Sequence, residues 1–332
     1  MAQITNTHDT YDAVGIREDL HGVVSMVSPD ERPLQKLISE RDCTDTNPRW
    51  TQDTLAAPDT TNAEVQGFEY SYASATPTAE VSTYTQIISK LAMVSETADK
   101  VRTADGKTET SRIKANLGKE ILIDAEAIAL SNQASVAGDS STAPKMGGLR
   151  AWLASNDSMG SGGASGGFSG GLVGVATNGT QRAFTKALLK DVISDTYVAG
   201  GNPNTLMCSP YVKETFSGLM SDTDIAAPTS EFGNKAGTIV AAADFYRSDF
   251  GIINVIPNRQ MARAGAAVAR NAFLIEPDKL HMGWLRRISQ DKKAAKTGDA
   301  TPIAMKGECA LIVDNEASCG VIADLFGMSA AA

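Results

Sequence analysis

The sequence predicts an α+β fold, because its expected helices and strands do not alternate regularly along the chain. Three observations support this prediction. About 50 residues at the N-terminus contain few apolar side chains, a stretch rich in strand-forming residues follows, and one long amphipathic helix then precedes a mixture of short helices and strands. A doubly wound parallel sheet would instead require strand and helix to alternate.

The first 49 residues are polar and mixed in charge, and we interpret them as an N-terminal arm. Ser28 followed by Pro29 predicts the start of one short helix, because Ser is favoured as an N-cap and Pro suits the first helical turn. A segment with so few apolar side chains can bury little of its own surface. We therefore expect the arm to become ordered by lying on another surface.

Residues 50–99 are predicted to form an extended loop. Residues 68–72 alternate aromatic and polar side chains, and residues 81–85 are rich in β-branched and aromatic residues, so both are predicted to be strands of one hairpin. No Lys or Arg lies between Arg49 and Lys90, whereas five acids do: Asp53, Asp59, Glu64, Glu69 and Glu80. A two-stranded hairpin alone is only marginally stable in water. The loop is therefore expected to pack on a partner.

A single long helix is predicted from Thr108 to Asn132. Its apolar residues recur every three or four positions: Ile113, Leu117, Ile121, Ala125 and Ile128. A helix of this length spans about 37 Å.

The rest of the chain is predicted to be mixed. A helix over 181–199 ends at a Gly-Gly-Asn-Pro sequence, and a second helix runs from Ser209-Pro210 to about Leu219. The expected strands are 205–208, 238–246, 251–256, 272–275, 280–288, 303–313 and 320–322.

A glycine-rich stretch over 156–180 twice matches the G-x-S-x-G pattern of serine hydrolases, with Ser165 and Ser169 at the nucleophile position. Such a nucleophile needs a strand before it and a helix directly after it. Polar loop sequence surrounds these serines, and His281 is the one histidine that follows them. We interpret the stretch as a flexible connector, and keep a hydrolase that uses Ser165 or Ser169 with His281 as an alternative.

Other catalytic and cofactor motifs are incomplete. Ser111 to Lys114 matches S-x-x-K and Lys296 to Gly298 matches K-T-G, but no S-D-N lies between them. Gly106-Lys107-Thr108 ends like a phosphate-binding loop, yet the required earlier glycine is Val101. We therefore predict no catalytic residues and no cofactor.

The composition argues against metal, membrane and nucleic-acid-coating roles. The four cysteines form no C-x-x-C pair and the chain has three histidines, so no zinc site is expected. No apolar run reaches 18 residues, so no membrane span is expected. The net charge of −9 is unsuited to tight phosphate binding.

Several segments, taken in order, resemble the major capsid proteins of tailed double-stranded DNA bacteriophages, which share the HK97-like fold. They begin with SPDERPLQKLI, RWTQDTLAAPDTTNAEVQG and SRIKANLGKEILIDAEAIALSN, and continue with GGLRAWL, AGGNPNTLMCSP and FGIINVIPNRQM. The last is AKTGDATPIAMKGECALIVDNEASCGVIADL. No single segment is a strict signature, and their joint order carries the resemblance.

The resemblance implies seven regions. They are an N-terminal arm (1–49), an extended loop (50–99), a peripheral domain with a spine helix (100–155), a Gly-rich connector (156–180), an axial domain (181–278), returning peripheral strands (279–316) and a final axial strand (317–332). It also implies hexamers and pentamers that close into an icosahedral head, assembled in the host cytoplasm around DNA bound without sequence specificity. Scaffolding, portal and decoration proteins are the further partners. An encapsulin-like compartment, which shares the fold, is a second alternative.

Within such a shell, the loop of one subunit is predicted to contact the helix start of a neighbour. The loop residues are Glu64, Phe68, Glu69, Tyr70, Tyr72 and Glu80, and the helix residues are Lys107, Arg112, Lys114 and Lys119. Some related shells form an isopeptide bond from a loop lysine, but residues 50–89 contain no lysine. We therefore expect a non-covalent shell, and also expect no N-terminal cleavage and no fused scaffolding segment.

Overall fold

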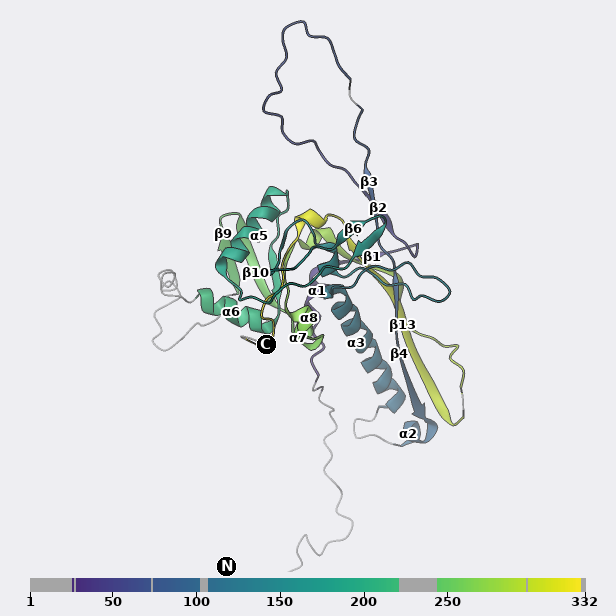
Figure 1. Ribbon diagram of the computed structural model, residues 1–332. Helices are drawn as coiled ribbons and strands as arrows, with labels where there is room; N and C mark the ends of the chain where they lie inside the picture. The colour runs from purple at the N-terminus through teal and green to yellow at the C-terminus, as the bar shows by residue number, and fades with distance from the viewer. Residues whose placement is uncertain are drawn as a thin grey trace, which may run out of the picture.

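The computed structural model describes residue 26 and residues 28–72, 74–101, 107–220, 244–296 and 298–329. It shows a body from which a long loop projects (Figure 1). Two sheets of four and six strands make up the body, and two further pairs of strands form small hairpin ladders. The predicted arm before residue 26, most of the predicted strand 238–246, Gly106 and Thr297 lie outside the described residues.

The four-stranded sheet has the order β1-β12-β13-β4. Its strands are β1 (Ser39–Asp42), β4 (Gln86–Ser95), β12 (Leu280–Gln290) and β13 (Ala300–Val313). The long helix α3 (Glu109–Leu130) runs along this sheet (Figure 1), and Leu117 packs with Val94 and Ile303 in a small buried cluster. The short helix α2 (Glu96–Lys100) lies between β4 and α3 in the chain.

The six-stranded sheet has the order β5-β14-β11-β8-β10-β9. Its strands are β5 (Asp157–Ser158), β8 (Thr205–Cys208), β9 (Phe245–Ser248), β10 (Gly251–Pro257), β11 (Ala272–Ile275) and β14 (Gly320–Ile322). Helices α5 (Lys186–Val198) and α6 (Pro210–Met220) share a core with it, in which Leu206, Phe216 and Leu274 are completely buried.

Short elements fill the space around the two sheets. They are α1 (Pro33–Leu37), α4 (Leu149–Trp152), α7 (Arg259–Arg263), α8 (Ala266–Ala269) and the 3-10 turns η2 (Pro277–Lys279) and η3 (Glu316–Ser318). The two small ladders are β2 (Arg49–Gln52) with β3 (Ala79–Ser82), and β6 (Gly167–Ser169) with β7 (Leu172–Gly174).

The helix and strand predictions from local pattern are largely confirmed. The long helix differs from its predicted range by one residue at the start and two at the end, with Thr108 as its N-cap. Strands 205–208, 272–275 and 320–322 have the predicted bounds. The arm helix is misplaced: it begins at Pro33 rather than after Ser28, and its N-cap Arg32 makes no side-chain cap hydrogen bond.

Two predictions about loops are wrong. Residues 68–72 form no strand, and β3 pairs with β2 rather than with them, because β-propensity does not specify the partner strand. The Gly-rich stretch is not a flexible connector either. It contains the β6–β7 hairpin, and Phe168 stacks on Trp152 with ring centroids 5.8 Å apart.

Hydrogen bonds from distant residues hold this Gly-rich segment. The carboxylate of Asp324 accepts hydrogen bonds from the backbone N–H of Gly160 (3.0 Å) and of Gly179 (2.9 Å). The side chain of Asn132, just beyond α3, exchanges two hydrogen bonds with the backbone of Ala176. The segment is therefore an integral part of the body.

Candidate assembly surfaces

Residues 53–78 form a loop that projects far beyond the body (Figure 1). Its base is the β2–β3 ladder, where Arg49 pairs with Ser82 and Gln52 with Ala79. The described residues between these strands have no helix or strand, and Leu55 is 98% exposed. The loop thus has almost no contact with its own subunit.

Three aromatic side chains contact one another along this loop, with Phe68 edge-on to Tyr70 and Tyr70 stacked on Tyr72. The ring centroids of Phe68 and Tyr70 are 5.3 Å apart, and those of Tyr70 and Tyr72 are 6.4 Å apart. All three side chains are exposed, and Tyr72 is 91% exposed. Aromatic groups of this size contribute most when they leave water, so this ladder is suited to contact with a second molecule.

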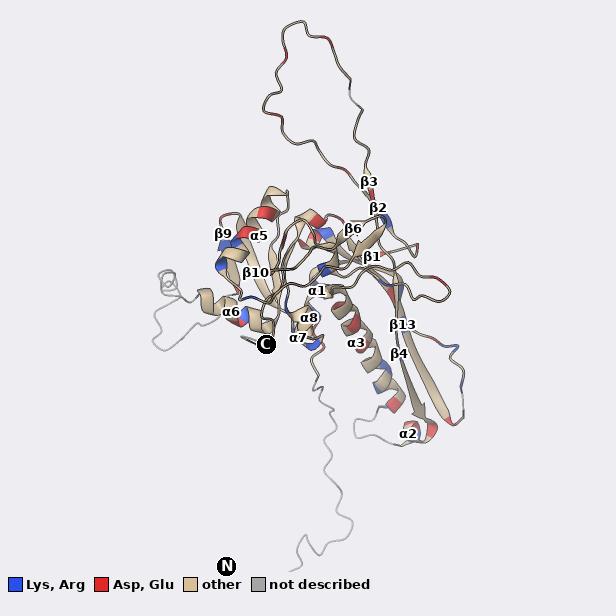
Figure 2. Cartoon of the chain, in the orientation of Figure 1, with Lys and Arg blue, Asp and Glu red and all other residues tan. Residues whose placement is uncertain are grey.

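The loop carries negative charge only, as Figure 2 shows. Of the three glutamates predicted at the contact, Glu80 lies at the base and pairs with Arg49 of its own chain at 2.9 Å. Glu64 and Glu69 are exposed, and neither makes an ion pair with another described residue. Glu80 is therefore paired within its own subunit, whereas Glu64 and Glu69 are exposed and available to another molecule.

The basic residues at the start of α3 are partly neutralised within the subunit. Lys119 pairs with Asp30 of the arm at 2.9 Å. Arg112 forms an ion pair with Glu109, one helical turn away. Hydrogen bonds from Thr110, together with a smaller effect of nearby positive charges that include Lys114, lower the pKa of Asp99. Lys107 directly precedes the N-cap Thr108. The positive charge available to a neighbour is therefore smaller than the sequence count of four.

A buried glutamate fastens the arm to the body. Glu126 of α3 is completely buried, and its carboxylate accepts hydrogen bonds from the backbone N–H of Leu34 (2.8 Å) and of Gln35 (2.9 Å). The side chain of Asn258 donates a third, at 2.8 Å. Burial raises the pKa of Glu126, and these hydrogen bonds oppose that shift. Glu126 was not predicted from the sequence, where its only signal is a charge directly after Ala125 of the apolar stripe.

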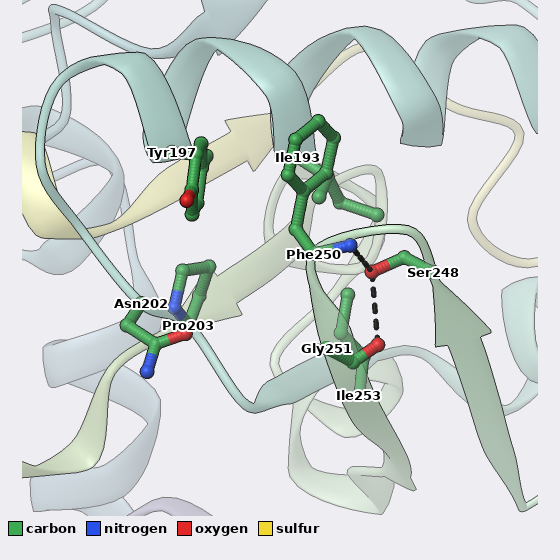
Figure 3. Close-up of a pocket in the computed structure, with 8 residues that line it drawn as sticks. All are labelled: Ile193, Tyr197, Asn202, Pro203, Ser248, Phe250, Gly251 and Ile253. Carbon is green, nitrogen blue, oxygen red and sulfur yellow. Dashed lines mark hydrogen bonds between the residues drawn. The ribbon is translucent and has the colours of Figure 1, made fainter.

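An apolar surface lies at the β9 edge of the six-stranded sheet. The rings of Tyr197 from α5 and Phe250 from the β9–β10 turn approach to 4.6 Å between centroids, above a shallow pocket (Figure 3). Val198 and Ile252 beside them are exposed. Because β9 is an edge strand, its outer backbone groups are open to another chain. This surface was also missed from sequence.

The residues of the hydrolase alternative do not come together. His281 on β12 is held by Ser39 (Oγ to Nδ1, 2.5 Å) and by Asp314 (Oδ2 to Nε2, 2.9 Å). Both imidazole nitrogens are therefore engaged with residues other than Ser165 or Ser169. The Ser39 contact fastens β1 to β12, which pair in parallel, and the Asp314 contact joins β12 to the residue after β13.

Within the described ranges, no cluster of three or more His, Cys, Asp or Glu side chains could hold a metal ion. No helix in the same ranges is long and apolar enough to cross a membrane. The four cysteines are free thiols.

Comparison with known proteins decides the family. A model described as the SU10 major capsid protein matches residues 3–326. The chain belongs to the SU10 major capsid protein family. The major capsid protein of Escherichia phage Phieco32 is 28% identical over 244 residues, which cover 64% of this chain and 69% of that protein.

Several solved structures share the fold of this capsid protein at low sequence identity. The Cyanophage A-1(L) capsid asymmetric unit gives a TM-score of 0.64 at 13% identity, covering 97% of this chain and 99% of that one. A structure titled Gordonia phage Cozz gives 0.60 at 12% identity, covering 97% and 96%. The capsid of a native GTA particle gives 0.59 at 12% identity, covering 95% and 96%. The fold is therefore a mixed α+β, HK97-like capsid fold.

The resemblance seen in the sequence is thus confirmed in family, fold and role. The chain is a major capsid protein of a phage head, a self-associating structural component of the virion rather than an enzyme. Neither the hydrolase nor the compartment alternative has support from these matches.

Proposed function

We propose that this capsid protein forms hexamers and pentamers of a closed icosahedral shell, in which each loop 53–78 docks on the neighbouring subunit. One observation carries the proposal: the loop projects from the body with an exposed aromatic ladder and without packing of its own. Such a segment gains order when another chain buries it.

The partner surface that fits this loop is the start of α3 in the neighbour. The loop bears only acids, whereas Lys107, Arg112, Lys114 and Lys119 bring positive charge to the helix start. Since Arg112 and Lys119 already have partners, ion pairing contributes mainly to register. The burial of Phe68, Tyr70 and Tyr72 supplies most of the binding free energy.

The seven regions inferred from the resemblance fit this role. Residues 1–49 act as the arm, 50–99 as the extended loop, and 100–155 with 279–316 as the peripheral domain. Residues 181–278 with 317–332 form the axial domain, and 156–180 join the two. The support is that α3 packs on the sheet that contains β12 and β13, whereas the six-stranded sheet combines β8, β10 and β11 with the late strand β14.

The DNA inside the shell and the other proteins bound to it follow from the proposed role as a shell subunit. A chain with a net charge of −9 is unsuited to binding phosphates tightly overall, which suits a container that packs and releases double-stranded DNA without reading its sequence. Scaffolding, portal and decoration proteins complete the expected set of partners.

Replacing residues 56–76 with a Gly/Ser linker of equal length tests the proposal. We expect subunits that keep the wild-type unfolding temperature but form no closed shells in electron micrographs. Normal shells from this variant would refute loop docking. Wild-type particles that are boiled in denaturant should run as monomers on a gel, and a covalent ladder would contradict the non-covalent shell.

A further inference from the structure

Three arginines and two aspartates come together beside the Gly-rich segment: Arg150, Arg182, Arg270, Asp157 and Asp324. Arg150 and Asp324 are completely buried, whereas Arg182 and Arg270 are partly exposed. Arg150 Nη1 lies 4.0 Å from a carboxylate oxygen of Asp157, and Arg270 Nη2 lies 3.0 Å from one of Asp324. The charges of Asp157, Asp324 and Arg270 all act on the Arg150 guanidinium. Three positive and two negative charges leave one positive charge uncompensated within this cluster.

The Arg150 side chain is completely buried, and half of its guanidinium has no partner. Nη1 donates one long hydrogen bond of 3.4 Å to the Leu153 carbonyl. Nε and Nη2 are buried and have no hydrogen-bond partner among the described residues. These two nitrogens share one edge of the planar group, where their N–H bonds are parallel. This edge is the one that binds anions in a bidentate manner.

The neighbouring groups also have more free donors than free acceptors. Nε of Arg182 and Nε of Arg270 are buried without a hydrogen-bond partner. On the acceptor side, Asp324 Oδ2 already accepts hydrogen bonds from the N–H groups of Gly160 and Gly179. Two buried carboxylate oxygens, Asp157 Oδ2 and Asp324 Oδ1, have no hydrogen-bond partner among the described residues, so four unpaired donor nitrogens face two unpaired acceptor oxygens. Buried donors of a charged group are rarely left unpaired, because desolvation without compensation is costly.

We propose that the Nε–Nη2 edge of Arg150 binds a small monovalent inorganic anion of the halide class inside the folded subunit. A water molecule would accept the two hydrogen bonds but would leave the excess positive charge uncompensated, whereas a halide satisfies both. The completely buried setting of Arg150 favours a small, spherical ion over a larger oxyanion.

Such an anion would stabilise the junction at which the Gly-rich segment meets the residues after β14. Asp324, which shares the cluster, is also the residue that holds Gly160 and Gly179. An ion that binds only the folded state raises the unfolding temperature with its concentration. This dependence distinguishes a bound halide from ordered water.

The test is a thermal unfolding series on purified full-length protein, in sodium bromide or sodium gluconate at equal ionic strength. Gluconate is too large for an interior site and serves as the non-binding anion. We expect an unfolding temperature about 3 °C higher in bromide for the wild type. The exposed control Arg259→Gln should show the same difference, and Arg150→Met should show none.

An equal unfolding temperature of the wild type in both salts would overturn the proposal in favour of ordered water. An unchanged bromide effect in Arg150→Met would overturn it by placing the anion elsewhere. Should Arg150→Met fail to fold, Arg150→Lys keeps the charge but lacks the paired donors. Its bromide effect should be lost or strongly reduced, and full retention would overturn the proposal.

Discussion

The loop 53–78 and the Gly-rich segment 156–180 contrast in structure. Both contain many residues typical of loops, and neither contains a predicted helix. The Gly-rich segment forms a hairpin inside the body, donates backbone hydrogen bonds to Asp324 and accepts one from Asn132. The loop projects into solvent. The difference shows that irregular sequence becomes ordered only where distant residues supply partners.

Glycine content explains why the Gly-rich segment, and not the loop 53–78, packs within the body. A Cβ atom added to Gly160 would lie 2.0 Å from the carbonyl oxygen of Thr180, and one added to Gly179 would lie 2.4 Å from the carbonyl oxygen of Gly160. Only residues without Cβ permit such approach. The loop instead carries acids and aromatic rings, which are groups that recognise a second surface.

Of the variants considered, Gly160→Ala is expected to lower stability most, because it would prevent the Gly-rich segment from packing in the body. The new methyl group would collide with the Thr180 carbonyl, so the Gly-rich segment would have to leave its position. We expect a loss of roughly 3 kcal/mol or more in unfolding free energy, measured by denaturant titration. Gly174→Ala is the control, because its nearest atom would lie at 3.7 Å. Equal stability of the two variants would contradict the packing argument.

Glu126→Ala should give the next largest effect, because the arm, like the Gly-rich segment, is held by one distant carboxylate. Loss of this acceptor leaves the N–H groups of Leu34 and Gln35 unpaired and should cost about 2–3 kcal/mol. Exposed Glu120→Ala on the same helix is the control.

The Glu126 effect should depend on pH. Burial raises the folded-state pKa of Glu126 above its usual value of 4.5, so the folded state binds this proton more readily than the unfolded chain. The contribution of this carboxyl to stability is therefore fully present below pH 4.5 and decreases as the pH rises through the raised pKa. The stability difference between wild type and Glu126→Ala should shrink over that interval, and a growing difference would contradict the assigned shift.

The double variant Tyr70→Ala/Tyr72→Ala tests whether the loop depends on a second chain. Each ring should contribute about 2 kcal/mol to assembly, while subunit unfolding should not change. Shell yield can be measured by sedimentation, with Thr60→Ala as a loop control. A lower unfolding temperature of the isolated subunit would mean that the loop packs on its own body.

A smaller, salt-dependent effect is expected from Glu64→Lys/Glu69→Lys. Exposed ion pairs contribute about 0–1 kcal/mol each, so reversal should impair assembly at low salt. The defect should fade at high salt, because the Debye length falls from about 30 Å at 0.01 M to about 3 Å at 1 M. A defect independent of salt would place the loop on a different surface.

The smallest effect is expected from Ser165→Ala and Ser169→Ala. Both serines lie in the Gly-rich segment as parts of the scaffold, so particles should assemble normally. Wild-type esterase turnover that disappears in either variant would contradict the structural role.

Local patterns predicted local structure well, and failed where a distant partner decides. The periodic apolar residues of α3 and the β-branched or buried runs of β8, β11 and β14 carry their own signal. No local sequence pattern predicts that Asp324 accepts a hydrogen bond from Gly160, or that β3 pairs with β2 rather than with residues 68–72. Tyr70 and Tyr72, the proposed contact residues, could be singled out from sequence as aromatics in an unpaired loop, whereas Glu126 and the Tyr197–Phe250 surface depend on tertiary packing.

The position of β14 also sets the order in which a subunit can be completed during synthesis. This strand lies between β5 and β11 in the sheet, although both of those strands are translated before it. Until it emerges from the ribosome, the six-stranded sheet has a gap and Asp324 cannot hold the Gly-rich segment. A nascent or prematurely terminated chain therefore lacks a finished body to offer its neighbours. Chains that stop before Gly320 should be absent from purified particles. Only subunits that contain the last strand are therefore expected in the shell.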